Sequence, residues 1–207
     1  MKRALVWKWL FVAELYPPGV SNKTLPCSGA VPKAMNPDLH KALVQLRTGE
    51  RLEMWEAAKA LVKEEDPSVV PELLALLADS MEPERRAAAA WTLGFLRASD
   101  AVQPLTHILV NKAEPPALRE HAAEALGYLS DARARSALIS SLSDENPDVV
   151  FSSTFALRTV GETEDIPHLA RLAAGSGLVS SNGESVMREA QEAIDQIKTR
   201  AERKLRD

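Results

Sequence analysis

The sequence predicts an all-α fold, a right-handed α-solenoid of about four helix pairs that ends in a C-terminal capping helix. Two observations support this prediction. The composition is 45% hydrophobic but only 5% aromatic, and the abundant alanine and leucine lose little side-chain entropy in a helix. In addition, two leucine positions recur along the chain in one register, and a repeat of about 20 to 50 residues indicates stacked supersecondary units.

The repeat is measured from two anchor leucines, one in each helix of a unit. The first anchor falls at Leu61, Leu93, Leu126 and Leu157, at intervals of 32, 33 and 31 residues. The second falls twelve residues later and keeps the same intervals, at Leu73, Leu105, Leu138 and Leu169. A unit of two short helices cannot bury its own apolar face, so the units must stack.

Within each unit the residue types fit two helices. The first helix carries small residues where its neighbours must approach: Ala57, Ala58, Ala60, Ala89, Ala90, Ala122, Ala123 and Ala125. The second carries an apolar residue three positions before its leucine, although Arg135 breaks this rule in the third unit. Prolines fall in the first turns of the second helices, where a missing N–H costs little. Asp66 and Asp131 precede two of these helices and are predicted to be N-caps.

The chain divides into four predicted segments. Residues 1–36 form an N-terminal extension with an apolar helix and a Pro/Gly/Ser-rich loop. Residues 37–174 carry the repeat array, 175–184 a loop that is flexible by composition, and 185–207 a capping helix with a basic end. The aromatic residues near Trp7 suit a helix that covers the first face of the array. A targeting segment and a translation start at Met35 are the alternatives that composition leaves open.

Charge, hydropathy and cysteine usage exclude several classes of protein. The formal charge of -4 gives no general attraction for a phosphate backbone, so we expect no nucleic-acid partner. No stretch approaches the ~20 apolar residues that a membrane span needs. Cys27 is the single cysteine, which excludes an internal disulfide and a cysteine-based metal site. It is compatible with a reducing compartment, and we expect a cytoplasmic protein.

The clearest unit is the stretch Arg119-Glu120-His121-Ala122-Ala123-Glu124-Ala125-Leu126-Gly127-Tyr128-Leu129-Ser130-Asp131. Together with glycines near the ends of the first helices, at Gly94, Gly127 and Gly161, it resembles the HEAT repeat family, especially the short bacterial type also found in phycobilin lyases. The resemblance covers roughly residues 38–175. It implies the solenoid fold, and it leaves the function open between binding scaffolds and auxiliary enzymes.

The sequence carries few patterns that are typical of catalytic sites. HEAT-repeat deoxyhypusine hydroxylases hold two irons with several His-Glu pairs, whereas the nearest match here is Glu120-His121, in reversed order and without a counterpart in other units. We therefore expect no metal, no cofactor and no enzymatic activity. A bilin lyase-like role is the alternative, and it rests on the repeat alone. The Trp91 and Phe95 pair, spaced i and i+4, is explained more economically by packing between units.

The leading hypothesis is a non-enzymatic scaffold that mediates protein-protein interaction. In most HEAT arrays the second helices line the concave face, so we expect binding there, at Gln103, His107, Ser136, Ser140 and Arg171. The loops after the first helices carry an acidic residue or cluster in each unit and are expected to form an acidic ridge: Glu64, Glu65, Asp100, Asp131 and Asp165. This ridge serves either as helix caps or as a surface that steers a basic protein partner.

Overall fold

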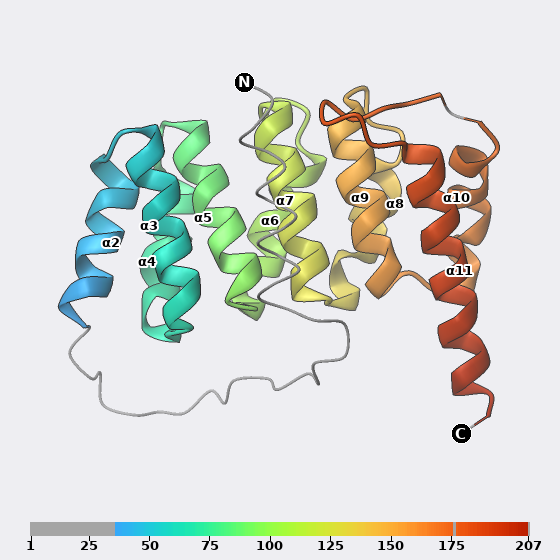
Figure 1. The fold of residues 1–207 in the computed structure, drawn as a ribbon, viewed down its shortest axis with the longest axis horizontal. Coiled ribbons are helices and arrows are strands. Elements are labelled where there is room, and N and C mark those ends of the chain that lie inside the picture. Colours follow the sequence, from blue (N-terminus) through green and yellow to red (C-terminus); the bar gives the residue numbers. More distant parts are fainter. Residues whose placement is uncertain (1–35, 176, 207) are drawn as a thin grey trace.

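The computed structural model describes residues 36–175 and 177–206, and these ranges are helical almost throughout (Figure 1). The helices are α2 (Pro37–Thr48), α3 (Arg51–Glu64), α4 (Val70–Asp79), α5 (Pro83–Phe95), α6 (Val102–Val110), α7 (Pro116–Leu129), α8 (Arg135–Ser141), α9 (Pro147–Val160), α10 (Ile166–Ala173) and α11 (Val186–Lys204). Short 3-10 helices precede α4, α6, α8 and α10, at Pro67–Val69, Ser99–Ala101, Ala132–Ala134 and Thr163–Asp165. The predicted apolar helix of the extension, Cys27 and Met35 lie outside the described residues.

The helices stack into the predicted α-solenoid. Each even-numbered helix packs against the odd-numbered helix that follows it, which makes the hairpins α2/α3, α4/α5, α6/α7, α8/α9 and α10/α11. The odd-numbered helices α3, α5, α7, α9 and α11 lie side by side in a continuous row (Figure 1). The sequence repeat was phased on the odd-numbered helices, so the structural pairs are displaced from it by half a unit. Helix α11, predicted as the cap, completes a hairpin with α10 and closes the row against α9.

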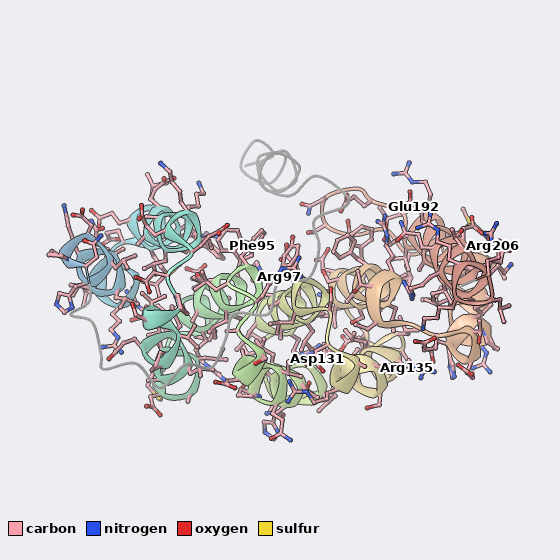
Figure 2. All side chains as sticks on the ribbon, turned by 90° about the horizontal axis from the view of Figure 1, so that it is seen from below. Phe95, Arg97, Asp131, Arg135, Glu192 and Arg206 are labelled. Carbon is pink, nitrogen blue, oxygen red and sulfur yellow. The ribbon has the colours of Figure 1, made fainter. Side chains whose placement is uncertain are left out.

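The array is curved. In the view of Figure 2 the odd-numbered helices follow an arc whose two ends bend toward the same side, and the even-numbered helices lie outside that arc. The odd-numbered helices therefore line the hollow side of the solenoid, which we call the inner surface. The even-numbered helices form the outer surface. The expectation that the second helices line the concave face is thereby corrected, because the half-unit phase of the repeat could not be read from its period.

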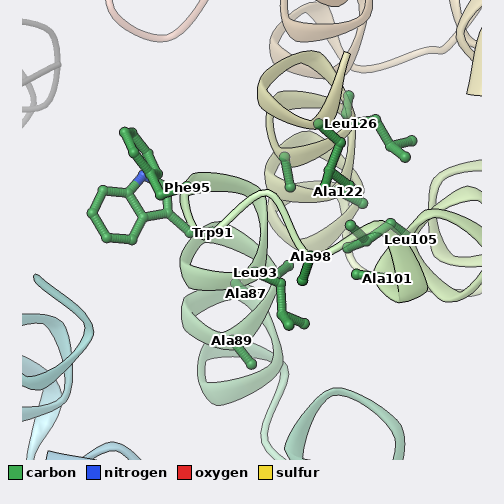
Figure 3. Close-up of a cluster of buried hydrophobic side chains, with 14 of the residues drawn as sticks. Ala87, Ala89, Trp91, Leu93, Phe95, Ala98, Ala101, Leu105, Ala122 and Leu126 are labelled. Atoms are coloured by element: carbon green, nitrogen blue, oxygen red, sulfur yellow. The ribbon is translucent and has the colours of Figure 1, made fainter. Parts of the chain in front are cut away.

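The core is built from leucine and alanine. All eight anchor leucines have no exposed surface, and every one of the largest fully buried side chains is a leucine. Alanines such as Ala89 and Ala122 fill the narrow spaces between neighbouring helices (Figure 3). Because small side chains let helix axes approach closely, the odd-numbered helices form a tight row. The predicted anchor register is confirmed in both helices of every unit.

The local signals at the helix ends are also confirmed. Asp66 Oδ1 accepts a hydrogen bond from Ser68 N at 2.8 Å, and Asp131 Oδ1 accepts one from Arg133 N at 2.9 Å. Both aspartates cap the 3-10 helices that lead into α4 and α8. Among the described residues no helix combines the length and apolar character that crossing a bilayer requires.

Candidate functional site

The five residues predicted to bind a partner on the second helices are exposed. Gln103 and His107 lie on α6, Ser136 and Ser140 on α8, and Arg171 on α10. These helices form the outer surface (Figure 2), so the five side chains share a convex face. Their role in binding stays a prediction, now for the outer side of the array.

The predicted acidic ridge carries cations as well. Glu64, Glu65 and Asp100 are exposed, whereas Asp131 is bound by the guanidinium of Arg133, with Nη2 donating to Oδ2 at 2.8 Å. This hydrogen bond lowers the pKa of the Asp131 carboxyl. The neighbouring Arg133 also donates to the Ser99 carbonyl at 3.2 Å, which ties the loops of two successive units together. This part of the ridge therefore has mixed charge.

Asp165 is buried and serves an inter-unit contact. Its carboxylate is held by Arg135, whose Nε donates to Oδ2 at 2.6 Å and whose Nη2 donates to Oδ1 at 3.0 Å. Burial raises the pKa of Asp165, but the hydrogen bonds from Arg135 outweigh it, so that the pKa is lowered overall. Arg135 and Asp131 both lie toward the outer helices (Figure 2). The pairing also explains why an arginine replaces the apolar residue expected at position 135.

The inner surface carries a feature that the sequence analysis did not assemble: a continuous stripe of aromatic rings. Trp55 on α3, Trp91 and Phe95 on α5, Tyr128 on α7 and Phe155 on α9 follow one another across four helices. Successive ring centroids are 6.1, 4.4, 4.2 and 6.4 Å apart. We call these five residues the aromatic stripe. Figure 2 shows Phe95 on the hollow side of the arc, and Figure 3 shows Trp91 and Phe95 together, beside the Ala/Leu core.

The predicted packing of Trp91 with Phe95 is confirmed, since their rings are in contact and also touch rings of the neighbouring units. Trp91 is 5% exposed. Its indole Nε1 is buried and has no hydrogen-bond partner among the described residues. A buried N–H without a partner costs about 1–3 kcal/mol, so this position on the inner surface has an unused donor.

Polar groups lie beside the stripe at α7. His121 Nδ1 lies 3.3 Å from Glu124 Oε2, and the Tyr128 hydroxyl donates to Glu124 Oε1 at 3.2 Å. The His121 ring also contacts Trp55, with centroids 5.4 Å apart. Burial, followed by the charge of Glu124 and the hydrogen bond to it, raises the pKa of Tyr128. The tyrosine therefore stays protonated and acts as a donor.

A pocket lies at the C-terminal side of the stripe, between α7, α9 and the loop of residues 178–185. We call it the acidic pocket, and its lining residues are Glu120, Glu124, Asp148, Phe151, Ser152, Phe155, Ser180, Asn182 and Glu184. Four of them are carboxylates and, among these described residues, none is cationic. The pocket thus offers negative charge beside two aromatic rings.

The loop that lines the acidic pocket makes contacts within itself and with α9. Val179 and Ser185 form an isolated antiparallel bridge, and Ser180 Oγ accepts a hydrogen bond from Glu184 N at 3.1 Å. Ser181 N donates to Asp148 Oδ1 at 2.6 Å, which ties the loop to the first turn of α9. The flexibility of this loop stays a prediction from its glycines and serines, and composition does not reveal the long-range hydrogen bond to Asp148.

The described ranges contain no group of three or more His, Cys, Asp or Glu side chains placed to hold a metal ion. His121, the residue in the near match to a diiron motif, has Glu124 and Trp55 as its described neighbours. The described residues therefore do not fit the diiron centre that the hydroxylase resemblance would require, since such a centre needs ligands from several helices.

Comparison with known proteins decides the family. A family model described as HEAT repeats matches residues 39–115 and 108–177. The chain belongs to the HEAT repeat family. Comparison with curated proteins found no match.

Among solved structures, this HEAT-repeat chain is similar to one in the complex of CpcE and CpcF of phycocyanin lyase from Nostoc sp. PCC7120. The identity is 24%, the TM-score is 0.62, and the match covers 87% of this chain and 71% of that chain. A crystal structure of an engineered protein also matches, with 18% identity, a TM-score of 0.49 and coverage of 80% and 98%. The first likeness supports the HEAT-repeat fold, and the second is too distant to add to it.

The residues of the aromatic stripe occupy regular positions relative to the anchor leucines of the HEAT repeats. Trp91, Glu124 and Phe155 each stand two residues before an anchor leucine, and Phe95 and Tyr128 each stand two residues after one. Residues so placed flank the buried leucine on the same helix, so they emerge on one side of the row. The aromatic positions carry no catalytic motif, so only their alignment with the anchor leucines makes the stripe recognisable in the sequence.

Proposed function

We propose that this HEAT-repeat protein is a non-enzymatic scaffold that binds a protein partner, and that its main binding face is the inner surface. The observation that carries the proposal is the aromatic stripe, which runs across four helices and ends at the acidic pocket. Tyrosine, tryptophan and phenylalanine are enriched at protein interfaces, and tryptophan and tyrosine are enriched among the hot spots.

The charge of the pocket favours a basic segment of the partner. A lysine or arginine side chain placed over Phe151 or Phe155 would meet both an aromatic face and nearby carboxylates such as Glu120 and Asp148. The surface already contains one such contact, because the guanidinium of Arg158 lies 5.3 Å from the centroid of Phe155. A protein partner also agrees with the similar chain from the phycocyanin lyase structure, which was solved as a complex of two proteins.

The test is an affinity pull-down from the native cell with the full chain and two matched variants. Trp55→Ala removes a half-buried ring of the stripe, and His107→Ala removes an exposed residue of the outer surface. We expect a stoichiometric protein partner with the wild type and with His107→Ala, and its loss with Trp55→Ala. Loss with His107→Ala alone would move the binding face to the outer helices. Recovery of a stoichiometric metal or chromophore would contradict a non-enzymatic scaffold.

A lyase-like helper is the second candidate function. It is favoured by the similarity to a chain of a phycocyanin lyase and by the aromatic stripe, whose rings can stack on a flat conjugated ligand. We expect the absorption spectrum of the purified protein to change on incubation with a free bilin if this candidate is right. A spectrum equal to the sum of the two components would rule it out.

A further inference from the structure

The N-terminal extension and the rest of this chain carry opposite net charge. Residues 1–35 contain five cationic side chains, Lys2, Arg3, Lys8, Lys23 and Lys33, and one acidic side chain, Glu14, so their formal charge is +4. The whole chain has 25 cationic and 29 acidic residues, which leaves 20 and 28 for residues 36–207 and a formal charge of -8. Opposite charges of this size attract, and they attract most at low ionic strength.

Aromatic residues are divided in the same way. The chain has ten. Six belong to residues 36–207, and all six are in the aromatic stripe or the acidic pocket, the sixth being Phe151. The other four fall within ten residues of the extension, at Trp7, Trp9, Phe11 and Tyr16. A short basic and aromatic segment is thus joined to an acidic and aromatic surface.

We propose that residues 2–16 of this chain bind the inner surface of its own repeat array and occupy the place of a partner segment. The aromatic side chains from Trp7 to Tyr16 lie against the stripe, and Lys2, Arg3 or Lys8 meets the carboxylates of the acidic pocket.

The connection is long enough for this arrangement. Residues 17–35 join the segment to Asn36, which caps α2 at one end of the array. Nineteen residues span up to about 60 Å when extended. Neighbouring packed helices are about 8–10 Å apart, so the row from α3 to α9 measures about 30 Å. Tethering also raises the effective concentration of the segment to the millimolar range, so a partner must compete with it.

The experiment uses the full chain with Cys27→Ser, so that one new cysteine carries a spin label. Asn182→Cys places the label at the acidic pocket, Ser136→Cys on the outer surface and Val44→Cys on the exposed side of α2. The readout is the intensity of the indole N–H signals of Trp7 and Trp9 in nitrogen-15 spectra. The chain has four tryptophans, so these signals are few, and Trp7→Phe and Trp9→Phe assign them.

We expect the label at position 182 to remove most of the Trp7 and Trp9 signal, and the labels at 136 and 44 to leave it. Lys8→Glu or molar salt should restore the signal next to the label at 182. No loss from position 182, or equal losses from all three labels, would overturn the proposal. Loss from position 44 alone would place the segment on the end of the array instead. Loss in a mixture of labelled unenriched chain and unlabelled enriched chain would show binding between two copies and would also overturn it.

The proposal rests on the inner surface being the binding face of the scaffold. Its failure can be distinguished from failure of the proposed function, because the pull-down reads binding of an outside protein and the spin-label experiment reads only the chain's own extension. A positive spin-label result together with a partner that displaces the segment would show an autoinhibited scaffold.

Discussion

The packing of α5 against α7 makes a sharp prediction at Gly94. A Cβ atom added there would lie 2.6 Å from Ala125 Cα and 2.8 Å from Ala125 Cβ. Both atoms belong to the neighbouring helix, and the backbone of that helix cannot yield as the end of a flexible side chain can. Gly127 occupies the equivalent place on α7, but a Cβ atom there would stay 3.1 Å from Ala156 Cα and Cβ. The two glycines therefore form a matched pair.

The magnitude follows from two opposing effects. Replacing a glycine inside a helix by alanine stabilises the helix by up to about 1 kcal/mol, and this gain applies to both positions. Overpacking a tight contact costs about 1–3 kcal/mol, and it applies mainly at Gly94. We expect Gly94→Ala to be less stable than Gly127→Ala by about 1–3 kcal/mol. For a chain of this size each kcal/mol shifts the melting temperature by about 2–4 °C.

Urea and thermal unfolding followed by far-UV circular dichroism measure this difference. The folded spectra of both variants should equal that of the wild type, because the substitutions do not remove a helix. Equal midpoints for the two variants, or a higher midpoint for Gly94→Ala, would refute the close approach of α5 and α7 at this position. That result would also mean that the small residues on the odd-numbered helices do not serve close approach of the helices.

Other substitutions test the polar contacts between units. In the wild type the buried guanidinium of Arg119 donates to Asp144 Oδ1 at 2.9 Å. Asp144→Asn leaves this guanidinium buried without its charge partner and should lower the free energy of unfolding by about 3–5 kcal/mol. Burial raises the Asp144 pKa, but hydrogen bonds led by that from Arg119 lower it overall. The stabilisation that the Asp144 carboxylate contributes is therefore fully present above the unfolded pKa of about 3.9. It is lost as the pH falls through the lower pKa of the folded state. Urea midpoints measured down to that pH range should fall less in Asp144→Asn than in the wild type. Arg135→Leu restores the apolar pattern but leaves the buried Asp165 without its arginine partner, and unfolding should show a loss of about 1–3 kcal/mol; no loss would contradict the inter-unit role. Tyr128→Phe removes the donor to a glutamate one turn earlier and should cost about 1 kcal/mol in the same assay.

The sequence was sufficient for the period and the interior of this solenoid. The anchor leucines repeat because each fills the same place between stacked helices, and a side chain in that place must be apolar and of one size. The caps at Asp66 and Asp131 were equally predictable, since an aspartate before a helix accepts hydrogen bonds from N–H groups that the helix itself leaves unpaired. These signals depend on residues close together in the sequence, so a single sequence is enough to predict the structure that they specify.

The same signals could not predict the phase of the repeat, that is, which two successive helices form a hairpin. The connection from α3 to α4 and the connection from α4 to α5 are both short, so loop length does not say which neighbours form a hairpin. Curvature depends on a small rotation between units that adds up along the array. Without it, the exposed residues of α6 and α8 could not be assigned to the outer surface. Arg135 shows the same limit, because its partner Asp165 lies in the following unit.

Two explanations of the aromatic stripe diverge at Trp91. If the rings serve only to pack neighbouring units, Trp91→Phe should change the unfolding midpoint, through a smaller ring and the loss of an unpaired buried N–H, and should leave the spin-label effect on Trp7 and Trp9 intact. If the stripe is a binding surface, the same substitution reduces the ring surface that the bound segment contacts, and the indole signals should recover next to the label at position 182. A purely structural stripe also gives no reason for four carboxylates at its end, because packing rings requires no charge. The combination of aromatic faces and negative charge on one concave surface is what a basic, aromatic ligand needs.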